Sequence, residues 1–344
     1  MEKSLRLASY NIEWFNSLFD ERDRLLLDDG PSARYGISRR DQAQAIADVL
    51  RALEADGILI VEAPDSNYNS HRSSARALEG FARHYGLRQS SAIQGFASDT
   101  QQEITFLYDP NCLTASHDPK GGSNGLSPRF DGTFHYDLNA DLIGDQIRFS
   151  KPPLEIALTT AAGQNLRLIG VHAKSKNPHG AKDEAQAMRI SIENRRKQLA
   201  QCIWIRARVE EELAQGKSLL VMGDFNDGPG LDEYEKLFGR SGVEIVLGDA
   251  ADPEQKLYDP HAAMALRARM GFAPTTARFY LPMQKRYFEA LLDFIMVSND
   301  LRQLGPKWHI WHPYCDPHLL KDPALQNALI TASDHFPVSI DLPQ

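Results

Sequence analysis

Side chains able to bind a metal ion or move a proton follow directly after short apolar runs at several places in this sequence. In residues 218–229, four apolar residues and Gly223 precede Asp224 and Asn226. The pattern predicts a buried strand that ends abruptly at a loop, where a rigid scaffold often holds catalytic groups. An Asp side chain can accept a proton from water or bind a metal ion, and an Asn side chain can orient an anion. Taken alone, however, the segment is explained more simply as a turn that closes a hairpin.

Three more predicted strands end in polar side chains, at Asn11, at Glu62 and at His172. A carboxylate directly after four apolar residues is costly to bury unless it meets a cation or hydrogen-bond donors, which favours a functional role for Glu62. Lys174 follows His172 and makes that strand exit attractive to anions. For Asn11, a solvated strand end explains the pattern equally well, and His172 on its own is more simply a core histidine.

The C-terminal part of the chain adds two acidic residues and an imidazole. Asp293 lies inside the apolar run 291–298, and Asp334 and His335 stand side by side before a final strand. A buried Asp requires a partner, and His is the usual one. So many carboxylate, amide and imidazole groups at strand exits are improbable by chance, and this argues against explaining each one separately.

The elements that would position these groups alternate between strands and helices. Helical spacing of apolar residues predicts helices, and β-branched or alternating residues predict strands, in these ranges: helices 38–53, 75–85 and 183–213, and strands 102–108, 147–151, 154–159 and 166–171. We expect a single domain over residues 1–344, with loop insertions near 111–145 and 229–289. In the long helix, Arg195 and Arg196 form a solvated face or lean toward the site.

Composition limits the classes of function. Hydrophobic residues make up 42% of the 344 residues and charged residues 24%, which suffices for a sizeable core. A formal charge of −8 argues against a protein that coats nucleic acid, although it allows an enzyme that engages DNA at one basic cleft. Three scattered cysteines indicate a reducing compartment, and no apolar run is long enough to span a membrane. We expect a cytoplasmic protein with no membrane contact and no obligate protein partner.

Taken together and in order, six segments resemble the endonuclease/exonuclease/phosphatase superfamily, which includes pancreatic-type deoxyribonuclease, AP endonucleases, sphingomyelinases and inositol-polyphosphate 5-phosphatases. The segments run from residue 9 to residue 335: Ser-Tyr-Asn-Ile at 9–12, Val-Glu at 61–62, Val-His-Ala-Lys-Ser at 171–175, Gly-Asp-Phe-Asn at 223–226, Leu-Asp-Phe-Ile at 292–295 and Ser-Asp-His at 333–335. The resemblance implies an α/β fold, a four-layer α/β/β/α sandwich of two mixed sheets packed face to face with helices outside.

The resemblance also implies a metal site. Glu62 would be the principal ligand of Mg²⁺ or Mn²⁺, and Asn11 and Asp334 would ligate the same ion or hold a second one. Hard oxygen donors suit these ions, which keep several waters and share the phosphate of the substrate.

The remaining roles describe attack of water on a phosphorus ester. By resemblance, Asp224 would orient and deprotonate the water, and Asn226 would hold the phosphate or the nucleophile. His335, oriented by Asp293, would donate to a phosphoryl oxygen, and Lys174 would help to neutralise its charge.

His172 would stabilise or protonate the leaving oxygen, and this residue points to the deoxyribonuclease and sphingomyelinase side of the family. In deoxyribonucleases a Glu pairs with this His, and either Glu103 or Gln102 would be its partner here, with the choice between them open. The resemblance therefore implies a metal-dependent phosphodiester hydrolase, with DNA as the favoured substrate and either endo- or exonucleolytic cleavage. A phosphodiesterase or phosphatase for small-molecule or lipid phosphoesters is the alternative, and an inactive scaffold is a minor one.

Overall fold

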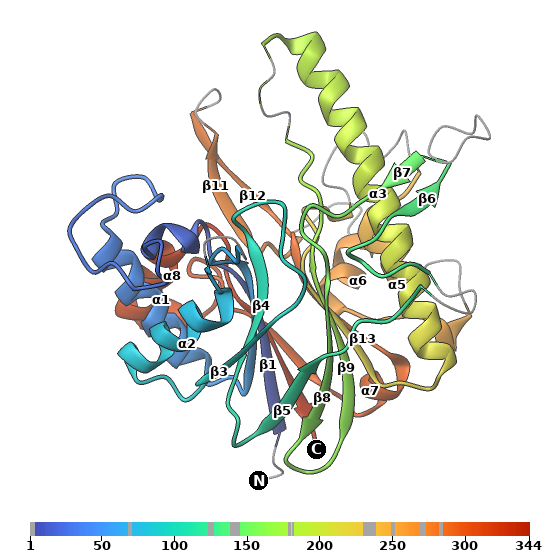
Figure 1. Ribbon diagram of the computed structural model, residues 1–344, viewed down its shortest axis with the longest axis horizontal. Helices are drawn as coiled ribbons and strands as arrows, with labels where there is room; N and C mark the ends of the chain where they lie inside the picture. The colour runs from blue at the N-terminus through green and yellow to red at the C-terminus, as the bar shows by residue number, and fades with distance from the viewer. Residues whose placement is uncertain are drawn as a thin grey trace.

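Two mixed β-sheets packed face to face form the centre of the molecule (Figure 1). The computed structural model describes residues 4–67, 71–122, 127–137, 145–177, 180, 182–229, 239–248, 252–267, 273–281 and 285–344. The six-stranded sheet has the order β14 (Lys307–Ile310), β15 (Val338–Pro343), β1 (Ser4–Asn11), β2 (Gly57–Ala63), β4 (Glu103–Tyr108), β3 (Ser91–Gln94). The five-stranded sheet has the order β13 (Asp293–Val297), β10 (Leu219–Asp224), β9 (Asn165–His172), β8 (Leu154–Thr160), β5 (Leu113–His117).

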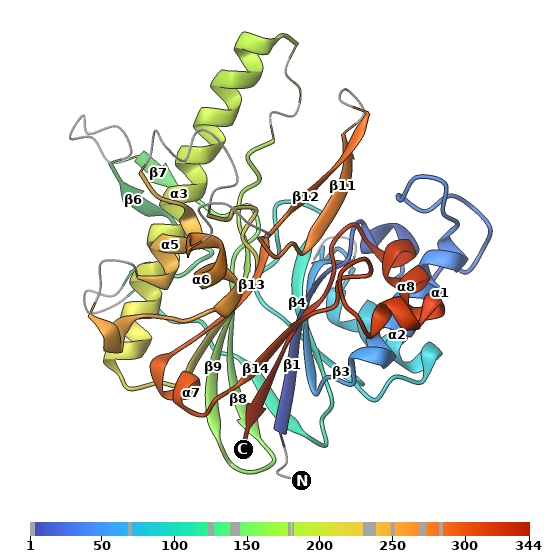
Figure 2. The ribbon, with the colours of Figure 1, turned by 180° about the vertical axis from the view of Figure 1, so that it is seen from behind.

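Helices cover the outer face of each sheet. The six-stranded sheet packs against α1 (Arg39–Leu53), α2 (Ser74–Tyr85) and α8 (Pro323–Ala332), and the five-stranded sheet packs against α3 (Glu184–Ala214), α5 (Gly242–Leu247) and α6 (Pro260–Arg267). A short helix, α7 (Asn299–Gln303), follows β13, and three 3₁₀ turns complete the described helices: η1 (Phe15–Leu18), η2 (Pro253–Gln255) and η3 (Leu319–Lys321). The four-layer α/β/β/α sandwich expected from the sequence is therefore confirmed (Figure 2).

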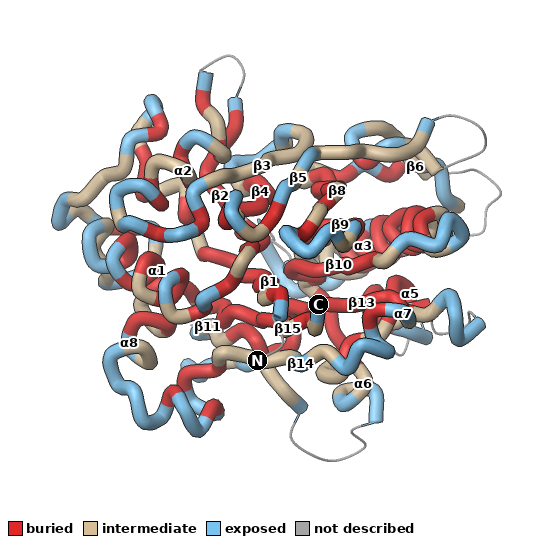
Figure 3. The backbone as a smooth tube through the Cα atoms, turned by 90° about the horizontal axis from the view of Figure 1, so that it is seen from below, coloured by how far each residue is buried: buried red, intermediate tan, exposed pale blue. Residues whose placement is uncertain are grey.

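Strand periodicity explains the core between the sheets. Successive side chains of a strand point to opposite faces, so every second residue enters the inter-sheet space. In β9, Leu166 and Leu168 lie in that space while Ile169 and Val171 pack against the helices. The sheets approach so closely at Gly170 that an added Cβ would lie 2.6 Å from the Leu59 side chain. The buried strands occupy the middle of the molecule in Figure 3, with exposed segments around them.

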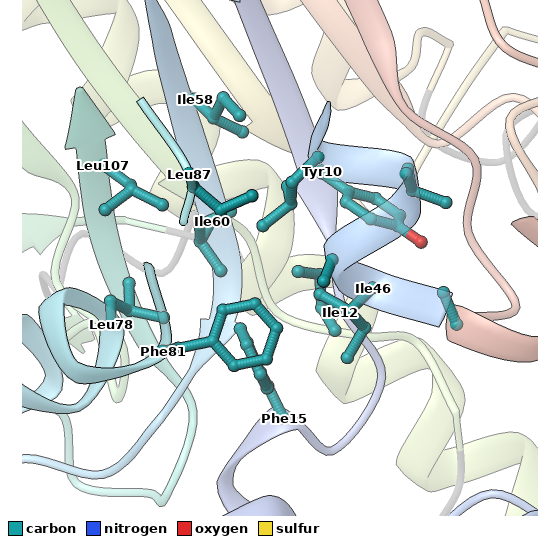
Figure 4. Packing of buried hydrophobic residues seen from close by; sticks show 14 of the residues in the cluster. Tyr10, Ile12, Phe15, Ile46, Ile58, Ile60, Leu78, Phe81, Leu87 and Leu107 are labelled. Atoms are coloured by element: carbon teal, nitrogen blue, oxygen red, sulfur yellow. The ribbon is translucent and has the colours of Figure 1, made fainter. Parts of the chain in front are cut away.

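A second cluster fixes the chain as it leaves β1. Phe15 lies edge-on to Phe81 of α2, with the ring centroids 5.2 Å apart, and both rings are buried in the same cluster as Ile46 of α1 (Figure 4). Ser38 caps α1 by accepting the N–H of Asp41, as the sequence indicates. This packing holds the segment after Asn11 in one conformation.

The long helix expected over 183–213 is present as α3, and Asp183 caps it. The helical spacing of apolar residues that predicts this helix begins at Met188 and places it toward the interior. Met188 is instead 51% exposed, so the first turns of α3 do not join the core. Figure 1 shows this end of α3 projecting beyond the sheets.

The ranges expected to be loop insertions contain strands. Residues 111–145 include β5 and the beginning of a small hairpin formed by β6 (Phe134–Tyr136) and β7 (Asp145–Ile147). Residues 229–289 include β11 (Ala277–Leu281) and most of β12 (Arg286–Ala290), as well as α5 and α6. These elements are short and only partly buried, so they lack the apolar periodicity that signals an element in the sequence. Within these two ranges, the structure does not describe residues 123–126, 138–144, 230–238, 249–251, 268–272 and 282–284.

None of the helices in the described ranges combines the length and the apolar character needed to cross a membrane.

Candidate functional site

The polar strand exits identified from the sequence meet at one end of the inter-sheet core. β9 and β10 run parallel, which pairs His172 with Asp224, and β13 runs antiparallel to β10, which pairs Asp293 with Asp224. In β1 and β2, also parallel, Asn11 pairs with Val61 and so lies beside Glu62. These side chains lie at the end of the apolar layer that the two sheets share, where a group can be buried and still reach the surface.

Asp224 is the most densely hydrogen-bonded group of the site. Its Oδ2 accepts Nδ2 of Asn11 at 3.0 Å and Nδ2 of Asn226 at 3.1 Å, and its Oδ1 accepts the backbone N–H of Asn226 at 2.7 Å. Burial raises the pKa of Asp224 to about 7, against the opposing effect of His335. Gly223 is required in the preceding position, since its φ is 137° and an added Cβ would lie 2.0 Å from the carbonyl oxygen of Val171.

Glu62 occupies an irregular position in β2. The pairing of β2 with β4 shifts register between Val61 and Ala63, and Glu62 has a φ of 59°, so the bulge aims its side chain differently from those of its neighbours. Its Oε2 accepts the backbone N–H of Trp14 at 3.2 Å. Burial raises the pKa of Glu62, and Lys151 and His335 oppose that effect.

His335 is bonded to the buried carboxylate of Asp293. Nδ1 of His335 lies 2.8 Å from Oδ2 of Asp293, and the same oxygen accepts the hydroxyl of Thr276 at 2.8 Å. Burial alone would lower the pKa of His335, but Asp293, Asp224 and Asp334 together raise it well above its usual value. This places a cationic hydrogen-bond donor in the site.

His172 has a partner that the sequence did not suggest. Its Nε2 lies 3.0 Å from Nζ of Lys151, which also donates to Oε1 of Gln102 at 3.4 Å. Burial, Lys151 and His335 lower the pKa of His172 well below its usual value, so the ring is neutral and accepts from the ammonium group. Glu103 instead accepts the backbone N–H groups of Ser66 and Ser98, so the carboxylate does not serve as the expected partner of His172.

Burial also lowers the pKa of Lys151 to about 8, while Glu62 and Asp224 oppose that effect. Lys174 lies close enough to Lys151 to lower this pKa further. The strand exit at His172 therefore gathers two cationic side chains.

Asp334 lies half-buried at the edge of the site. Its negative charge helps to raise the pKa values of Glu13, Glu62 and His335, so Asp334 lies near all three groups. Glu13 forms an ion pair with Arg34, yet burial and the nearby Asp334 raise the pKa of Glu13 to about 7. Glu13, Glu62 and Asp334 therefore lie within electrostatic range of one another.

A divalent cation fits this region. Oδ1 of Asn11 is buried and has no hydrogen-bond partner within the described ranges, while Nδ2 of the same amide is occupied by Asp224. A cation near Glu62 would offset the burial that disfavours its charged form. Among the residues described, no group of three or more His, Cys, Asp and Glu side chains is arranged to hold a metal ion. Carboxylate and amide oxygens, such as those of Glu62 and Asn11, suit an ion that keeps waters and shares a substrate oxygen, as Mg²⁺ does.

Gln198 holds the loops of the site in place, and it too was missed in the sequence. From its buried position on α3, its Nε2 donates to the carbonyl oxygens of Lys174, Phe225 and Asn226, at distances of 2.9, 3.1 and 3.0 Å. Arg195, one turn earlier, is buried and paired with Asp227, so it supports the loop after Asp224. The one signal in the sequence is that Gln198 directly follows the basic residues 195–197.

The arrangement can position and deprotonate a water molecule, stabilise a developing negative charge and supply a proton. Asp224 is the acceptor, held by two amides. His335 is the charged donor, and the pair Lys151 and His172 forms a second donor.

The chain matches the model of the Endonuclease/Exonuclease/phosphatase family over residues 8–335. Similar solved structures include TDP2 from Caenorhabditis elegans, with 15% identity and a TM-score of 0.51 over 99% of this chain and 75% of that chain. A humanized TDP2 of D. rerio with 14 mutations has 10% identity and a TM-score of 0.51, and 99% of both chains is covered. A Bacteroides thetaiotaomicron protein of the same family has 13% identity and a TM-score of 0.50 over 99% of this chain and 98% of that chain. No curated protein sequence matches this chain. At such identities the structural likenesses establish the fold alone.

Proposed function

The chain belongs to the endonuclease/exonuclease/phosphatase family, a family of hydrolases that act on phosphoester bonds, and we propose that it is a metal-dependent phosphodiesterase that cleaves DNA. The observation that carries the proposal is the meeting of Asp224, Asn11, Glu62 and the His335–Asp293 pair at one end of the sandwich. In-line attack on a phosphodiester requires an acceptor for the proton of water and donors for the phosphoryl oxygens, and this site supplies both.

Asp224 is the proposed base for the attacking water. Asn11 and Asn226 hold its Oδ2, so the carboxylate cannot rotate away from the water. Asn226 has a φ of 49°, a strained conformation that the neighbouring contacts maintain. The amide of Asn226 also donates to the carbonyl oxygen of Ala173 at 3.2 Å, which ties the base to the exit of β9.

His335 is the proposed donor to a non-bridging phosphoryl oxygen. Asp293 occupies Nδ1, which leaves Nε2 for the substrate. Because the pKa of His335 is raised well above its usual value, the imidazolium form is present at neutral pH and can balance charge that develops on phosphorus oxygens.

Lys151 is better placed than His172 to give a proton to the leaving oxygen. His172 is neutral and its Nε2 already faces the ammonium group, so the mobile proton of this pair belongs to Lys151. We therefore assign His172 to orienting Lys151, with Lys174 as a further cation for the phosphate.

Glu62 and Asn11 would hold Mg²⁺ or Mn²⁺, with Asp334 nearby. When bound, such an ion would supply Lewis-acid polarisation of the phosphoryl group. The chain itself contributes the side-chain oxygens of Glu62 and Asn11. The backbone N–H of Trp14 holds the Glu62 carboxylate in place by a hydrogen bond.

A phosphoesterase for a small-molecule or lipid substrate is the second candidate. The formal charge of −8 favours it, because an acidic protein gains little from neutralising the many phosphates of a long nucleic acid.

Hydrolysis of plasmid DNA, of a single-stranded oligonucleotide and of bis-p-nitrophenyl phosphate by the purified protein, with Mg²⁺ or Mn²⁺, tests the proposal. We expect DNA cleavage that is lost with EDTA and in His335→Ala, a variant that also controls for contaminating nucleases. Turnover of the small diester with intact DNA would favour the second candidate. Activity on neither substrate would favour an inactive scaffold.

A further inference from the structure

The hairpin of β11 and β12 begins directly at the proposed catalytic residues. The backbone N–H of Arg278 donates to the carbonyl oxygen of Asp334 at 2.7 Å, and the N–H of Phe336 donates to the carbonyl oxygen of Thr276 at 2.6 Å. These two bonds form an antiparallel bridge between Ala277 and His335. Figures 1 and 2 both show the hairpin rising from the sheets at the same end of the molecule as the projecting part of α3.

The bridge determines which face of the hairpin adjoins the site. Residues that pair directly across antiparallel strands place their side chains on the same face, so Ala277 and His335 share a face. Alternation along β11 puts Phe279 on that face, together with its cross-strand partner Phe288. Tyr280 and Tyr287, paired in the next position, lie on the opposite face.

Each face thus carries one aromatic pair. The ring centroids of Phe279 and Phe288 are 5.6 Å apart, and those of Tyr280 and Tyr287 are 5.3 Å apart. Phe279 and Phe288 are only partly buried, against a small cluster of Ala277, Ala290 and Leu292. The small alanines at the base of the face leave both rings partly exposed on the side of His335.

We propose that the Phe279–Phe288 pair stacks on an unpaired nucleobase next to the scissile phosphodiester, so that the substrate is single-stranded or locally unpaired nucleic acid. This inference rests on the proposed function. Aromatic side chains stack on bases irrespective of sequence, and bases inside a duplex have both faces covered by their neighbours. Stacking also suits a protein of formal charge −8, which has little excess positive charge with which to bind a phosphate backbone.

The test compares a single-stranded oligonucleotide, the same strand in a duplex, and the single strand with an abasic residue on either side of the cleaved bond. The wild type should prefer the single strand and should lose activity when one of the two flanking bases is removed. The double variant Phe279→Leu/Phe288→Leu keeps apolar bulk and removes the π-faces. Tyr280→Leu/Tyr287→Leu is its matched control on the other face of the hairpin.

We expect the phenylalanine variant to raise KM for the single strand about fivefold to a hundredfold, with kcat nearly unchanged, and to lose the distinction between intact and abasic strands. The tyrosine variant should stay within about twofold of wild type. If the phenylalanine variant does not fold, the wild-type comparison of intact and abasic strands still decides the matter.

Cleavage of DNA by a wild type that ignores the flanking bases or prefers the duplex would overturn the inference and leave the proposed function standing. If the two double variants lose activity equally, the phenylalanines serve only the structure of the hairpin. The same conclusion would follow if the phenylalanine variant lost activity equally on intact and abasic strands. A wild type that cleaves no DNA with either metal ion would remove the proposed function and this inference together.

Discussion

Replacing Asp293 by Asn would show how much the charge next to His335 contributes to activity. The substitution keeps an oxygen that can accept Nδ1–H of His335 and the hydroxyl of Thr276. Oδ1 of Asp293 has no partner among the described residues, so the new amide nitrogen can take its place. The shape of the pair is thereby conserved while its charge is removed.

The separation of 2.8 Å between Nδ1 and Oδ2 gives a Coulomb attraction of about 6 kcal/mol at an effective dielectric constant of about 20. Desolvation of the two buried groups offsets much of this, and hydrogen bonds to charged groups contribute a net value of about 1.5–3 kcal/mol. Because about 1.4 kcal/mol corresponds to a factor of ten in rate, we expect Asp293→Asn to lower kcat about 10- to 150-fold.

The assay is steady-state hydrolysis of the substrate found active in the first test, with circular dichroism to verify folding. Asp259→Asn is the matched control, since Asp259 is equally buried and accepts the N–H of Ile295 in β13, yet has no contact with His335. An Asp293→Asn enzyme that is folded and retains at least half of the wild-type kcat would refute the proposed role of the pair. A similar loss in Asp259→Asn would attribute the effect to general destabilisation of β13.

Three further outcomes are expected. Lys151→Met and Lys151→Arg should each lower kcat about a hundredfold or more, because a guanidinium group keeps its proton. A loss confined to KM, or a kcat largely restored by Arg, measured in the same assay, would contradict proton donation to the leaving oxygen. Glu62→Gln should raise the Mg²⁺ concentration for half-maximal activity at least about tenfold, and an unchanged Mg²⁺ titration would remove Glu62 from the metal site. Burial raises the pKa of Asp259 from 3.8 to about 6. Since the unfolded chain loses this proton first, Asp259 should lower the free energy of unfolding by about 2 kcal/mol as pH rises from 4 to 7. Glu13 and Asp224 also have raised pKa values, so the decline measured by urea unfolding should be smaller by this amount in Asp259→Asn than in wild type.

The fold was predictable from the sequence because its central strands are buried on both faces. Such strands read as continuous apolar runs, as in β2 and β10, and their ends are marked by polar residues. The edge strand β5 and the hairpin of β11 and β12 were not predicted, since half-exposed strands with few contacts leave no strong pattern. The exposed start of α3 was misjudged for a related reason, because apolar residues at helical spacing mark a face without showing what covers it.

The site was predictable where a residue lies at a strand end and not where a distant segment reaches it. Asn11, Glu62 and Asp224 belong to strand exits, so the parallel order of the strands brings them together. Lys151 ends the range 147–151 that was expected to be a strand, but β7 ends at Ile147 and Lys151 lies in an irregular segment before β8. Its contact with His172 spans 21 residues. Gln198 likewise reaches the site from the buried side of a helix that looks ordinary in the sequence.

Backbone conformations with positive φ hold two residues of the candidate site in place. Glu62 and Asn226 have positive φ values of 59° and 49°, and Gly223, at 137°, directly precedes Asp224. Such conformations are unfavourable for most residues and persist where the surrounding structure enforces them. Here the enforcement is visible, since Trp14 binds the side chain of Glu62 and Gln198 binds the carbonyl oxygen of Asn226. These fixed strand ends hold a carboxylate and an amide in the region where the polar strand exits meet.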